Sequence, residues 1–372
     1  MKGPLASMRI AIFGLSITSA WGNGHATTYR ALVRALARRG HQVTFYERQQ
    51  PWYAAHRDLP QPDFCRVILY DSVAALGRGV AHGALAADLA IVGSYVPEGA
   101  RVAEWLLAHT RGFTAFYDID TPVTLAKLDR GECAYLTPAL IPELDLYLSF
   151  TGGRILDRLQ RLYGAQRARP FYCSVDPDEY RPLELPPRYD LGYLGTYSSD
   201  RQPKLEKFLI GPAREWSAGR FCVAGAQYPN TLAWPPNVEH LEHLPPAAHA
   251  RFYNEQRFTL NVTRADMVAS GYSPSVRLFE AAACGVPIIS DDWHGLDHFF
   301  SPGREILIAR ETQDVMRFLR ELAPAEARAL GMRARERVLG QHTGEHRARQ
   351  LEAYVAELTA EHESSPRACH AY

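Results

Sequence analysis

The sequence predicts an α/β protein of two doubly wound domains that face a central cleft. Two series of short apolar segments, rich in Val, Ile, Leu and Phe, alternate with amphipathic segments. This is the pattern of parallel strands covered by helices on both faces. A proline-rich stretch over residues 169–187 separates the two series and predicts a connector. The length of 372 residues also suits about two domains.

The first series predicts a domain over residues 8–170. Its expected strands cover residues 9–15, 41–47, 66–70, 89–92, 113–117 and 144–150. The clearest helix spans residues 26–39, because Leu32, Val33, Leu36 and Ala37 fall on one stripe and Gly40 follows as a stop. Strands and helices that alternate in this way predict a parallel sheet.

The second series predicts a domain over residues 171–343. Its expected strands cover residues 190–194, 221–224, 258–262, 287–290 and 305–308, and its expected helices cover residues 278–284, 312–321 and 325–339. We expect residues 344–372 to form a last helix, to about Leu358, and a loose polar tail from Glu361, packing back on the first domain. Open parallel sheets bind ligands at the carboxyl ends of their strands, so the cleft is the expected site.

Charge and composition argue against several classes of protein. Lys plus Arg and Asp plus Glu both number 41, so the net charge is zero and we expect no nucleic-acid partner. No apolar run approaches the ~20 residues of a membrane helix, so we expect no transmembrane segment and a cytoplasmic protein. The six cysteines include no CxxC pair and no Cys/His group with zinc-ligand spacing, so we expect no metal site.

Residues 272–290 form the most informative segment. Ser273 or Ser275 suits a helix cap, and Val276 and Arg277 follow at the start of the helix. The free N–H groups and positive dipole end of such a helix suit a diphosphate, to which Arg277 adds a forked cation. Glu280 lies further along the same face, where a carboxylate accepts hydrogen bonds from ribose hydroxyls. The segment therefore predicts a nucleotide site, although Glu280 taken alone could be a solvated helix residue.

This segment resembles the donor site of retaining GT-B glycosyltransferases, family 4 in particular, and its details look closest to the CgeB-like branch. The resemblance continues upstream, where Gly195 and Thr196 follow a strand, and Arg201 and Lys204 stand where the family often has phosphate-binding cations. It implies two Rossmann-like domains and a nucleoside-diphosphate sugar, of UDP or GDP type, as co-substrate. It also implies retention of configuration without a metal and no further cofactor. Arg201 and Lys204 could equally be ordinary surface charges.

Five further residues are candidates for the donor site in the second domain. Gly225 ends a strand, where it could simply form a turn, and His243 and Leu244 stand where related enzymes hold the nucleobase by main-chain contacts. Asn261 and Arg264 follow another strand at the expected edge of the cleft. Arg264 could meet the phosphates or pair with Asp266.

Tyr272 marks a departure from the family pattern. That pattern has two Glu residues with seven residues between them, and counting back from Glu280 leads to Tyr272. The carboxylate that the resemblance implies for the donor sugar is therefore missing. The sugar and the stereochemical outcome stay open, with Asp118 or Asp120 as a base if the reaction inverts.

The first domain contributes a glycine-rich turn before its first helix. Gly22 and Gly24 allow a backbone to approach a ligand closely, and His25 is the only histidine on this loop, with a cleft role or a structural one. The turn also partly matches a dinucleotide fingerprint, with Glu47 as a ribose acceptor. Thr27 stands at the third glycine of that fingerprint, which makes the match weak.

Asp118 and Asp120 follow the strand predicted at residues 113–117. Two carboxylates at a strand end in a cleft could bind acceptor hydroxyls or act as a base. They could also hold a metal, as in the other glycosyltransferase architecture, and Asp120 could cap the helix that Pro122 begins. We list Asp118, Asp120 and His25 as catalytic candidates.

The sequence thus predicts a glycosyltransferase that moves a sugar to an acceptor hydroxyl or amine on a small molecule, glycan or surface polymer. Three alternatives remain: a sugar-nucleotide epimerase with the same fold, an NAD-dependent oxidoreductase using the Gly22 turn, and a non-catalytic coat-assembly protein. Nothing in the sequence indicates the oligomeric state.

Overall fold

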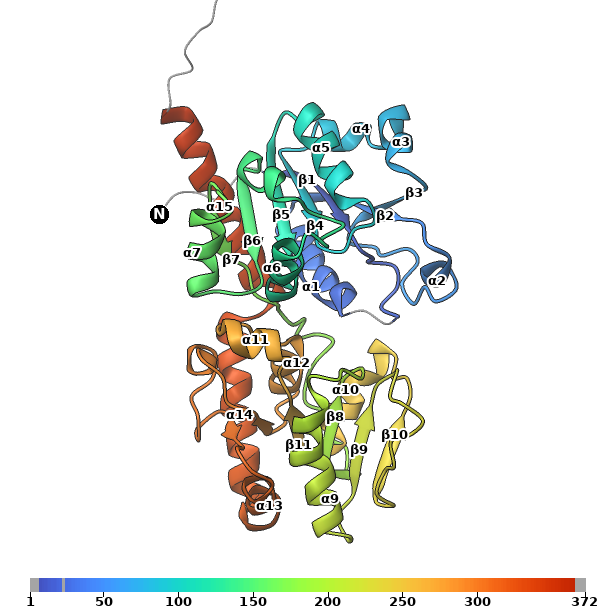
Figure 1. The fold of residues 1–372 in the computed structure, drawn as a ribbon, viewed down its shortest axis with the longest axis vertical. Coiled ribbons are helices and arrows are strands. Elements are labelled where there is room, and N and C mark those ends of the chain that lie inside the picture. Colours follow the sequence, from blue (N-terminus) through green and yellow to red (C-terminus); the bar gives the residue numbers. More distant parts are fainter. Residues whose placement is uncertain (1–6, 22–23, 365–372) are drawn as a thin grey trace, which may run out of the picture.

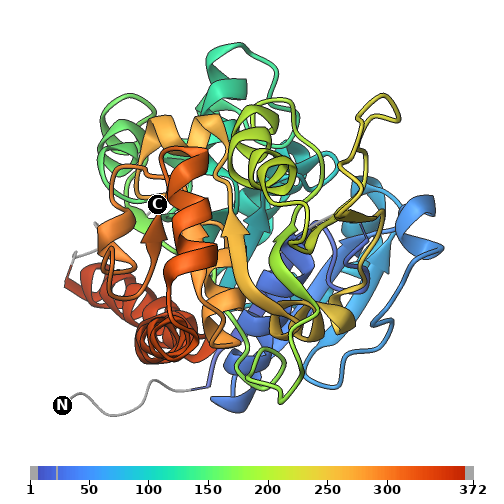
Figure 2. The same cartoon turned by 90° about the horizontal axis from the view of Figure 1, so that it is seen from below.

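The computed structural model describes residues 7–21 and 24–364, which form two parallel sheets, one above the other in Figure 1. We call the sheets with their helices the N-domain and the C-domain. Both sheets are covered by helices on their two faces, as the view of the C-domain from below shows (Figure 2). The predicted fold class is confirmed.

The N-domain sheet has the strand order β3-β2-β1-β4-β5-β6-β7, with every neighbouring pair parallel. The strands are β1 (Arg9–Gly14), β2 (Gln42–Arg48), β3 (Arg66–Tyr70), β4 (Leu89–Gly93), β5 (Phe113–Asp118), β6 (Leu146–Ser149) and β7 (Ala168–Pro170). The helices are α1 (His25–Arg38), α2 (Pro51–Ala54), α3 (Val73–Ala75), α4 (His82–Leu85), α5 (Gly99–His109), α6 (Thr121–Asp129) and α7 (Arg154–Arg161), with a π turn η1 (Leu76–Val80) and a 3-10 helix η2 (Pro138–Glu143).

The C-domain sheet has the strand order β10-β9-β8-β11-β12-β13, again all parallel. The strands are β8 (Tyr189–Leu194), β9 (Phe221–Ala224), β10 (Val238–Leu241), β11 (Gln256–Asn261), β12 (Ile288–Ser290) and β13 (Leu307–Ile308). The helices are α8 (Gln202–Leu205), α9 (Gly211–Glu215), α10 (Pro246–Asn254), α11 (Ala265–Ser270), α12 (Val276–Ala283), α13 (Thr312–Glu321) and α14 (Pro324–Gln341), with η3 (Glu206–Ile210) and η4 (Leu296–His298).

Two edge strands, β7 and β10, have no counterpart among the predicted strands. β7 is three residues long and ends in Pro170, inside the stretch predicted as a connector. β10 follows Pro235 and Pro236 and has two polar residues, Glu239 and His240, between Val238 and Leu241. Short edge strands pair on one side only and can contain proline, so they lack the apolar run by which the inner strands are identified.

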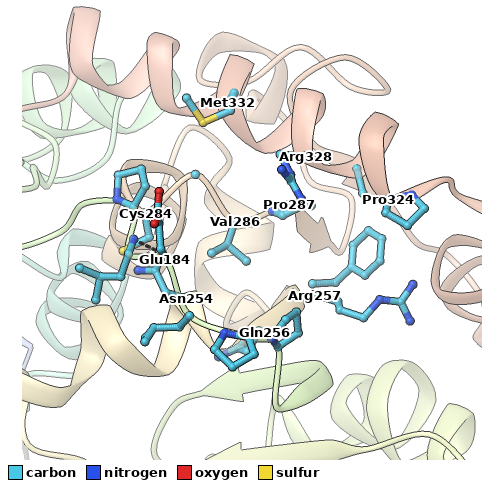
Figure 3. A pocket seen from close by; sticks show the side chains of 18 residues that line it. Glu184, Asn254, Gln256, Arg257, Cys284, Val286, Pro287, Pro324, Arg328 and Met332 are labelled. Atoms are coloured by element: carbon cyan, nitrogen blue, oxygen red, sulfur yellow. Dashed lines mark hydrogen bonds between the residues drawn. The ribbon is translucent and has the colours of Figure 1, made fainter.

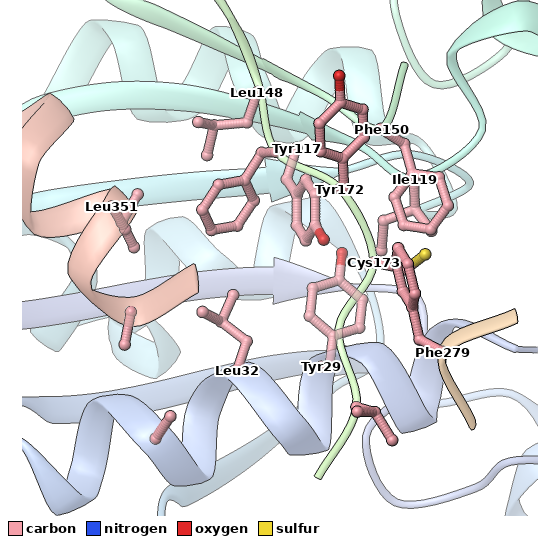
Figure 4. Close-up of a cluster of buried hydrophobic side chains, with 14 of the residues drawn as sticks. Tyr29, Leu32, Tyr117, Ile119, Leu148, Phe150, Tyr172, Cys173, Phe279 and Leu351 are labelled. Atoms are coloured by element: carbon pink, nitrogen blue, oxygen red, sulfur yellow. The ribbon is translucent and has the colours of Figure 1, made fainter. Parts of the chain in front are cut away.

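The chain crosses between the domains twice, and the two crossings lie side by side. Val175 N–H donates to the His342 carbonyl (3.1 Å), and Gly344 N–H donates to the Val175 carbonyl (3.1 Å). A hydrophobic cluster continues through this region, where Phe279 of α12 lies beside Cys173 and close to Tyr29 of α1 (Figure 4). The domains therefore share a buried core at the crossing.

The last helix, α15 (Gly344–Ser364), lies against α1 in the N-domain. Arg39 donates to both carboxylate oxygens of Glu352 (2.6 and 2.7 Å), and His41 Nε2 lies 2.8 Å from Glu352 Oε1. The prediction of a loose tail from Glu361 onward is wrong for residues 361–364, which are helical. Glu361 is helical and pairs with Arg167, which prolongs the helix to Ser364.

Candidate functional site

A cavity of about 750 Å³ lies between the domains, at the carboxyl ends of the strands. The N-domain lines it with Ala20, Trp21, Gly24, Thr27, Trp52 and Tyr53. The C-domain lines it with residues 194–196, 224–227 and 242–244, and with Pro246, His249, Tyr253, Val276, Arg277 and Glu280. Residues more than 200 positions apart in the sequence thus meet in one site.

Two glycine turns, after β8 and β9, pack against each other at the floor of this cavity. A Cβ on Gly225 would lie 2.1 Å from the Gly195 carbonyl oxygen, and a Cβ on Gly195 would lie 2.8 Å from Arg277 Nη2. Neither position has room for a side chain. The turns therefore expose main chain, including Thr196, to whatever the cavity binds.

Arg277 is buried at the start of α12 and is held from three sides. Its Nε donates to the Leu194 carbonyl, its Nη1 donates to Asn261 Oδ1 (2.9 Å), and its guanidinium lies 4.7 Å from the Tyr193 ring centroid. No carboxylate among the described residues forms a salt bridge with it. Its charge is therefore fixed in place and free to attract an anion.

Arg201 adds a second cation without a carboxylate partner in the described part of the chain. Its Nη2 donates to the Thr196 carbonyl, and its Nε is buried without a hydrogen-bond partner among those residues. Burial, together with the charges of Arg277 and Arg264, lowers the pKa of Arg201. Lys204 differs, because it pairs with the buried Asp291 (2.5 Å). The excess positive charge thus comes from the arginines.

The N-terminus of α12 points its positive end at the same place. Ser275 is the N-cap residue, but its hydroxyl donates to Asn261 Oδ1 (2.8 Å) and makes no cap hydrogen bond. Val276 and Arg277, in the first turn, line the cavity. The first amides of the helix are thus available to an anion. Asn261 contacts both Ser275 and Arg277, which suits a positioning role.

Glu280 lies one turn further along α12, 4% exposed, on the wall of the cavity. Tyr253 donates to its Oε2 (3.0 Å). Gly225, His243 and Leu244 line the same cavity, and the Leu244 carbonyl lies 3.1 Å from His249 Nε2. The predicted residues from β9, β10 and α12 are therefore brought together.

A polar cluster from the N-domain faces Arg264 across the domain interface. Asp120 accepts a hydrogen bond from the Tyr95 hydroxyl (3.0 Å) and lies 3.8 Å from Arg264 Nη1. The His25 ring lies 5.4 Å from that of Tyr95, and its buried Nδ1 has no hydrogen-bond partner among the described residues. Burial lowers the pKa of His25 to about 4, so the ring is neutral at pH 7.

Tyr95 is absent from the residues predicted for this cluster. It is the second residue after β4 and has a φ of 62°, a left-handed conformation that is uncommon outside glycine. Its position just after a strand end is the one signal in the sequence that could have indicated it.

Asp118 is sealed away from the cavity. It is fully buried and accepts hydrogen bonds from Tyr147 (2.6 Å) and Thr124 (2.7 Å). Burial raises its pKa to about 6, although these hydrogen bonds oppose the shift. Asp120, two residues later, is the N-cap residue of α6 without a side-chain cap hydrogen bond, and burial raises its pKa too. Of these two carboxylates, only that of Asp120 faces the other domain.

Tyr272 lies at the interface between the domains. Its φ is 45°, and its ring fills a slot between Gly153 and Gly295, at which a Cβ would lie 2.6 and 2.7 Å from ring atoms. Its carbonyl accepts from Gly152 N–H (3.0 Å), and the neighbouring Ser273 hydroxyl shares a hydrogen bond with Thr151 (2.9 Å). Both residues therefore join the domains.

The glycine-rich turn is described only in part. Gly22 lies outside the described residues, whereas Gly24 lines the cavity. Glu47, the ribose acceptor of the dinucleotide hypothesis, accepts from Ile17 N–H, Thr18 N–H and the Thr18 hydroxyl at 2.6–3.0 Å and is fully buried. Since its oxygens hold the loop after β1, the oxidoreductase alternative loses its ribose acceptor.

A second cavity, of about 570 Å³, lies at the opposite ends of the C-domain strands (Figure 3). It is formed by the connector at residues 182–187, the start of β11 and α14, and Glu184 is its only carboxylate among the described residues. All of its lining residues lie between Pro182 and Met332, so no residue of the N-domain lines it. Among the described residues we find no cluster of three or more His, Cys, Asp or Glu side chains that could hold a metal ion. No helix in that part of the chain is long and apolar enough to cross a membrane.

The sequence matches a family model described as glycosyl transferase-like over residues 201–353. That stretch contains Arg201, Arg264, Arg277 and Glu280. No curated protein matches the chain.

Solved structures resemble it over nearly its whole length. The sucrose-phosphate synthase of Thermosynechococcus elongatus has a TM-score of 0.69 at 17% identity, with 95% of this chain and 100% of that chain covered. Anabaena HepE, solved with UDP and glucose, has a TM-score of 0.67 at 11% identity, with 94% and 100% covered. A trehalose-6-phosphate protein from E. coli, bound with UDP-2-fluoro glucose, has a TM-score of 0.64 at 10% identity, with 93% and 98% covered.

At these identities the structural similarities establish the fold, and the family model gives the class of enzyme. The model match covers the part of the chain that supplies the two unpaired arginines and Glu280. The chain is therefore an enzyme of the glycosyltransferase type with the GT-B fold.

Proposed function

We propose that the protein transfers a sugar from a nucleoside-diphosphate sugar to an acceptor hydroxyl or amine, with retention of configuration and without a metal ion. We also propose that it belongs with family 4, near the CgeB-like branch. One observation carries the proposal. Arg277, the start of α12 and Glu280 line one cavity, and Arg201 donates to the carbonyl of Thr196, which lines it too; neither arginine forms a salt bridge with a carboxylate of the described chain.

The donor is assigned to this cavity in three parts. The diphosphate meets Arg277, Arg201 and the amides of Thr196, Val276 and Arg277. The ribose hydroxyls donate to Glu280, which Tyr253 holds in place. The nucleobase lies against residues 225 and 243–244. UDP is the first nucleotide to test, because HepE and the E. coli protein were solved with UDP or a UDP sugar.

The acceptor is assigned to the cluster of His25, Tyr95, Asp120 and Arg264. Asp120 already accepts a hydrogen bond from Tyr95, and a second oxygen acceptor there suits an incoming hydroxyl. Arg264 lies 3.8 Å from this carboxylate, and its charge helps to lower the pKa of Arg201. Neutral His25 adds a ring nitrogen without a partner in the described chain. Tyr272 takes no part, because its ring is fixed between two glycines.

The proposed reaction breaks the bond between the anomeric carbon and the diphosphate. The acceptor oxygen or nitrogen forms the new bond on the face that the diphosphate leaves, and its proton passes to the departing phosphate. The negative charge that builds on the diphosphate is stabilised by Arg277, Arg201 and the dipole of α12. These fixed positive charges are the reason to propose a reaction without a metal ion.

The test is calorimetric titration with UDP and GDP, compared between the wild type and Arg277→Ala. Loss of a charge-assisted bond should weaken binding by about 1–3 kcal/mol. Arg328→Ala, a change at the second cavity, should leave the affinity unchanged. Equal affinities in the wild type and Arg277→Ala would refute the phosphate assignment, and conversion of a sugar nucleotide to its epimer without transfer would refute the reaction.

A further inference from the structure

Two exposed tryptophans of the N-domain line the interdomain cavity. Trp52 is 50% exposed and Trp21 is 42% exposed. Of the large hydrophobic side chains that are exposed in the described part of the chain, which also include Leu69, Leu162 and Met332, only these two line that cavity. Moving the large apolar surface of an indole out of water is favourable. An indole that stays exposed in a ligand cavity therefore indicates a surface that a bound ligand covers.

Trp52 lies in α2, a single turn that begins at Pro51, three residues after the end of β2. It meets Tyr53 edge-on, with ring centroids 6.0 Å apart. Trp21 is stacked on His56 at 4.8 Å, which orients its ring. Both indoles are therefore carried by the loops at the carboxyl ends of β1 and β2, and Figure 1 places α2 on the side of the molecule where β9 and β10 lie below it.

The position of Trp52 separates two possible ligands, the acceptor and the nucleobase. The acceptor cluster of Tyr95, Asp120 and Arg264 does not line the cavity that Trp52 lines, whereas residues 225–227 and 242–244 do. Those two C-domain segments contain no Trp, Tyr or Phe. They offer main-chain amides and carbonyls, which recognise the edge of a base but give no flat apolar surface for its face.

We propose that Trp52, supported by Trp21, forms the aromatic platform on which the nucleobase of the donor stacks. This inference rests on the proposed function, and it adds that the two domains share recognition of the nucleotide. The C-domain binds the diphosphate and the ribose, and the N-domain covers the base. Purines and pyrimidines both have a π-face, so stacking strengthens binding of any base, while the C-domain segments select among them.

The experiment compares Trp52→Ala with the wild type in calorimetric titrations with UDP, GDP and inorganic pyrophosphate. The dissociation constants of UDP and GDP should rise about tenfold, the scale of one lost base–aromatic stack, while that of pyrophosphate stays unchanged. Trp52→Phe should restore most of the affinity. Leu69→Ala, which removes an exposed apolar side chain outside the cavity, is the matched control and should change neither.

The outcomes separate this inference from the function on which it rests. If the wild type binds UDP or GDP and Trp52→Ala binds them equally well, the platform is refuted and the proposed function stands. If pyrophosphate and the nucleotides weaken together, Trp52 acts through the phosphate site and the platform is likewise refuted. If the wild type binds neither nucleotide, both proposals fail. Since Trp52 is exposed, an unchanged melting temperature will show that the variant is folded.

Discussion

At the scale of single residues, the same side chain takes different roles according to what surrounds it. Asp118 and Asp120 are two residues apart at the end of β5. Asp118 is enclosed by Tyr147 and Thr124, whereas Asp120 reaches Tyr95 and faces Arg264 of the other domain. The first carboxyl holds the strand end in place, and the second is in a position to meet an acceptor.

Asp118→Asn should change the pH dependence of stability. The pKa of Asp118 is raised from its ordinary 3.8 to about 6, so the folded state binds this proton more tightly than the unfolded state does. Its contribution to the free energy of unfolding is therefore present at low pH and lost as the pH rises through that interval. In urea denaturation, the variant should show a flatter profile across the interval than the wild type.

Asp129→Asn is the control for this profile. Hydrogen bonds from Tyr163 and Arg158 lower the pKa of Asp129, so its contribution changes only below 3.8. A second readout is transfer activity, which Asp118→Asn should retain and Asp120→Asn should mostly lose. Loss of activity in Asp118→Asn with an unchanged stability profile would contradict the structural role.

The sequence was informative at this scale where one continuous segment builds the site. Residues 273–280 place a helix start, Arg277 and Glu280 in order, and the structure brings them to the cavity. It was not informative where the site depends on contacts between distant segments. Nothing in the sequence near Tyr95 or Tyr253 shows that their hydroxyls meet Asp120 and Glu280.

At the scale of elements, loops at the ends of strands join the domains. Tyr272, in the loop between α11 and α12, fills the slot between Gly153 before α7 and Gly295 before η4. The family pattern alone predicts a carboxylate for the donor sugar at this position. The structure gives a reason for an aromatic ring, because the two glycines leave a flat gap that a ring fills.

Gly153→Ala should destabilise the fold by roughly 1–3 kcal/mol, because it adds a collision with Tyr272 to the strain of a positive φ. Gly131→Ala is the matched control. Its φ of 69° is close to the 60° of Gly153, but nothing lies within 4 Å of its added Cβ. The difference between their free energies of unfolding in denaturant measures the Tyr272 contact together with the strain of the Gly153 ψ of −142°. Equal losses would show that the contact adds nothing.

The inner strands were predictable from their apolar runs, while the edge strands β7 and β10 were not. An inner strand such as β4 is buried along its whole length, and this burial requires Val, Ile, Leu and Ala in succession. β10 is buried at Val238 alone, and β7 at Ala168 alone. Whether these edge segments form strands depends on pairing with the neighbouring strand. The local sequence pattern does not show this pairing.

At the scale of the whole molecule, α15 ties the end of the chain to the N-domain. Arg39 and His41 of the N-domain both meet Glu352, which is 9% exposed. Arg39 also reaches Glu345 at the start of the helix. Removing Glu352 would leave His41 Nε2 without its partner and Arg39 with Glu345 as its remaining carboxylate.

Glu352→Ala should therefore lower the free energy of unfolding by roughly 2–4 kcal/mol. Glu357→Ala is the matched control on the same helix, since its pairing with Arg169 spans 3.3 Å between half-exposed side chains. Such surface pairs contribute about 0–1 kcal/mol. Similar losses of unfolding free energy in the two variants would show that the buried position of Glu352 does not make its ion pairs more stabilising than a surface pair.

The two chain crossings between the domains, which pair at Val175 and Thr343, also determine how a mechanical force passes through the molecule. The chain enters and leaves the C-domain at adjacent points, joined by the hydrogen bonds of Val175. The C-domain is thus topologically an insertion, and β1 and α15 both belong to the N-domain. A force applied between β1 and α15 would pass through the N-domain and this bridge, leaving the C-domain outside the line of tension until the bridge breaks.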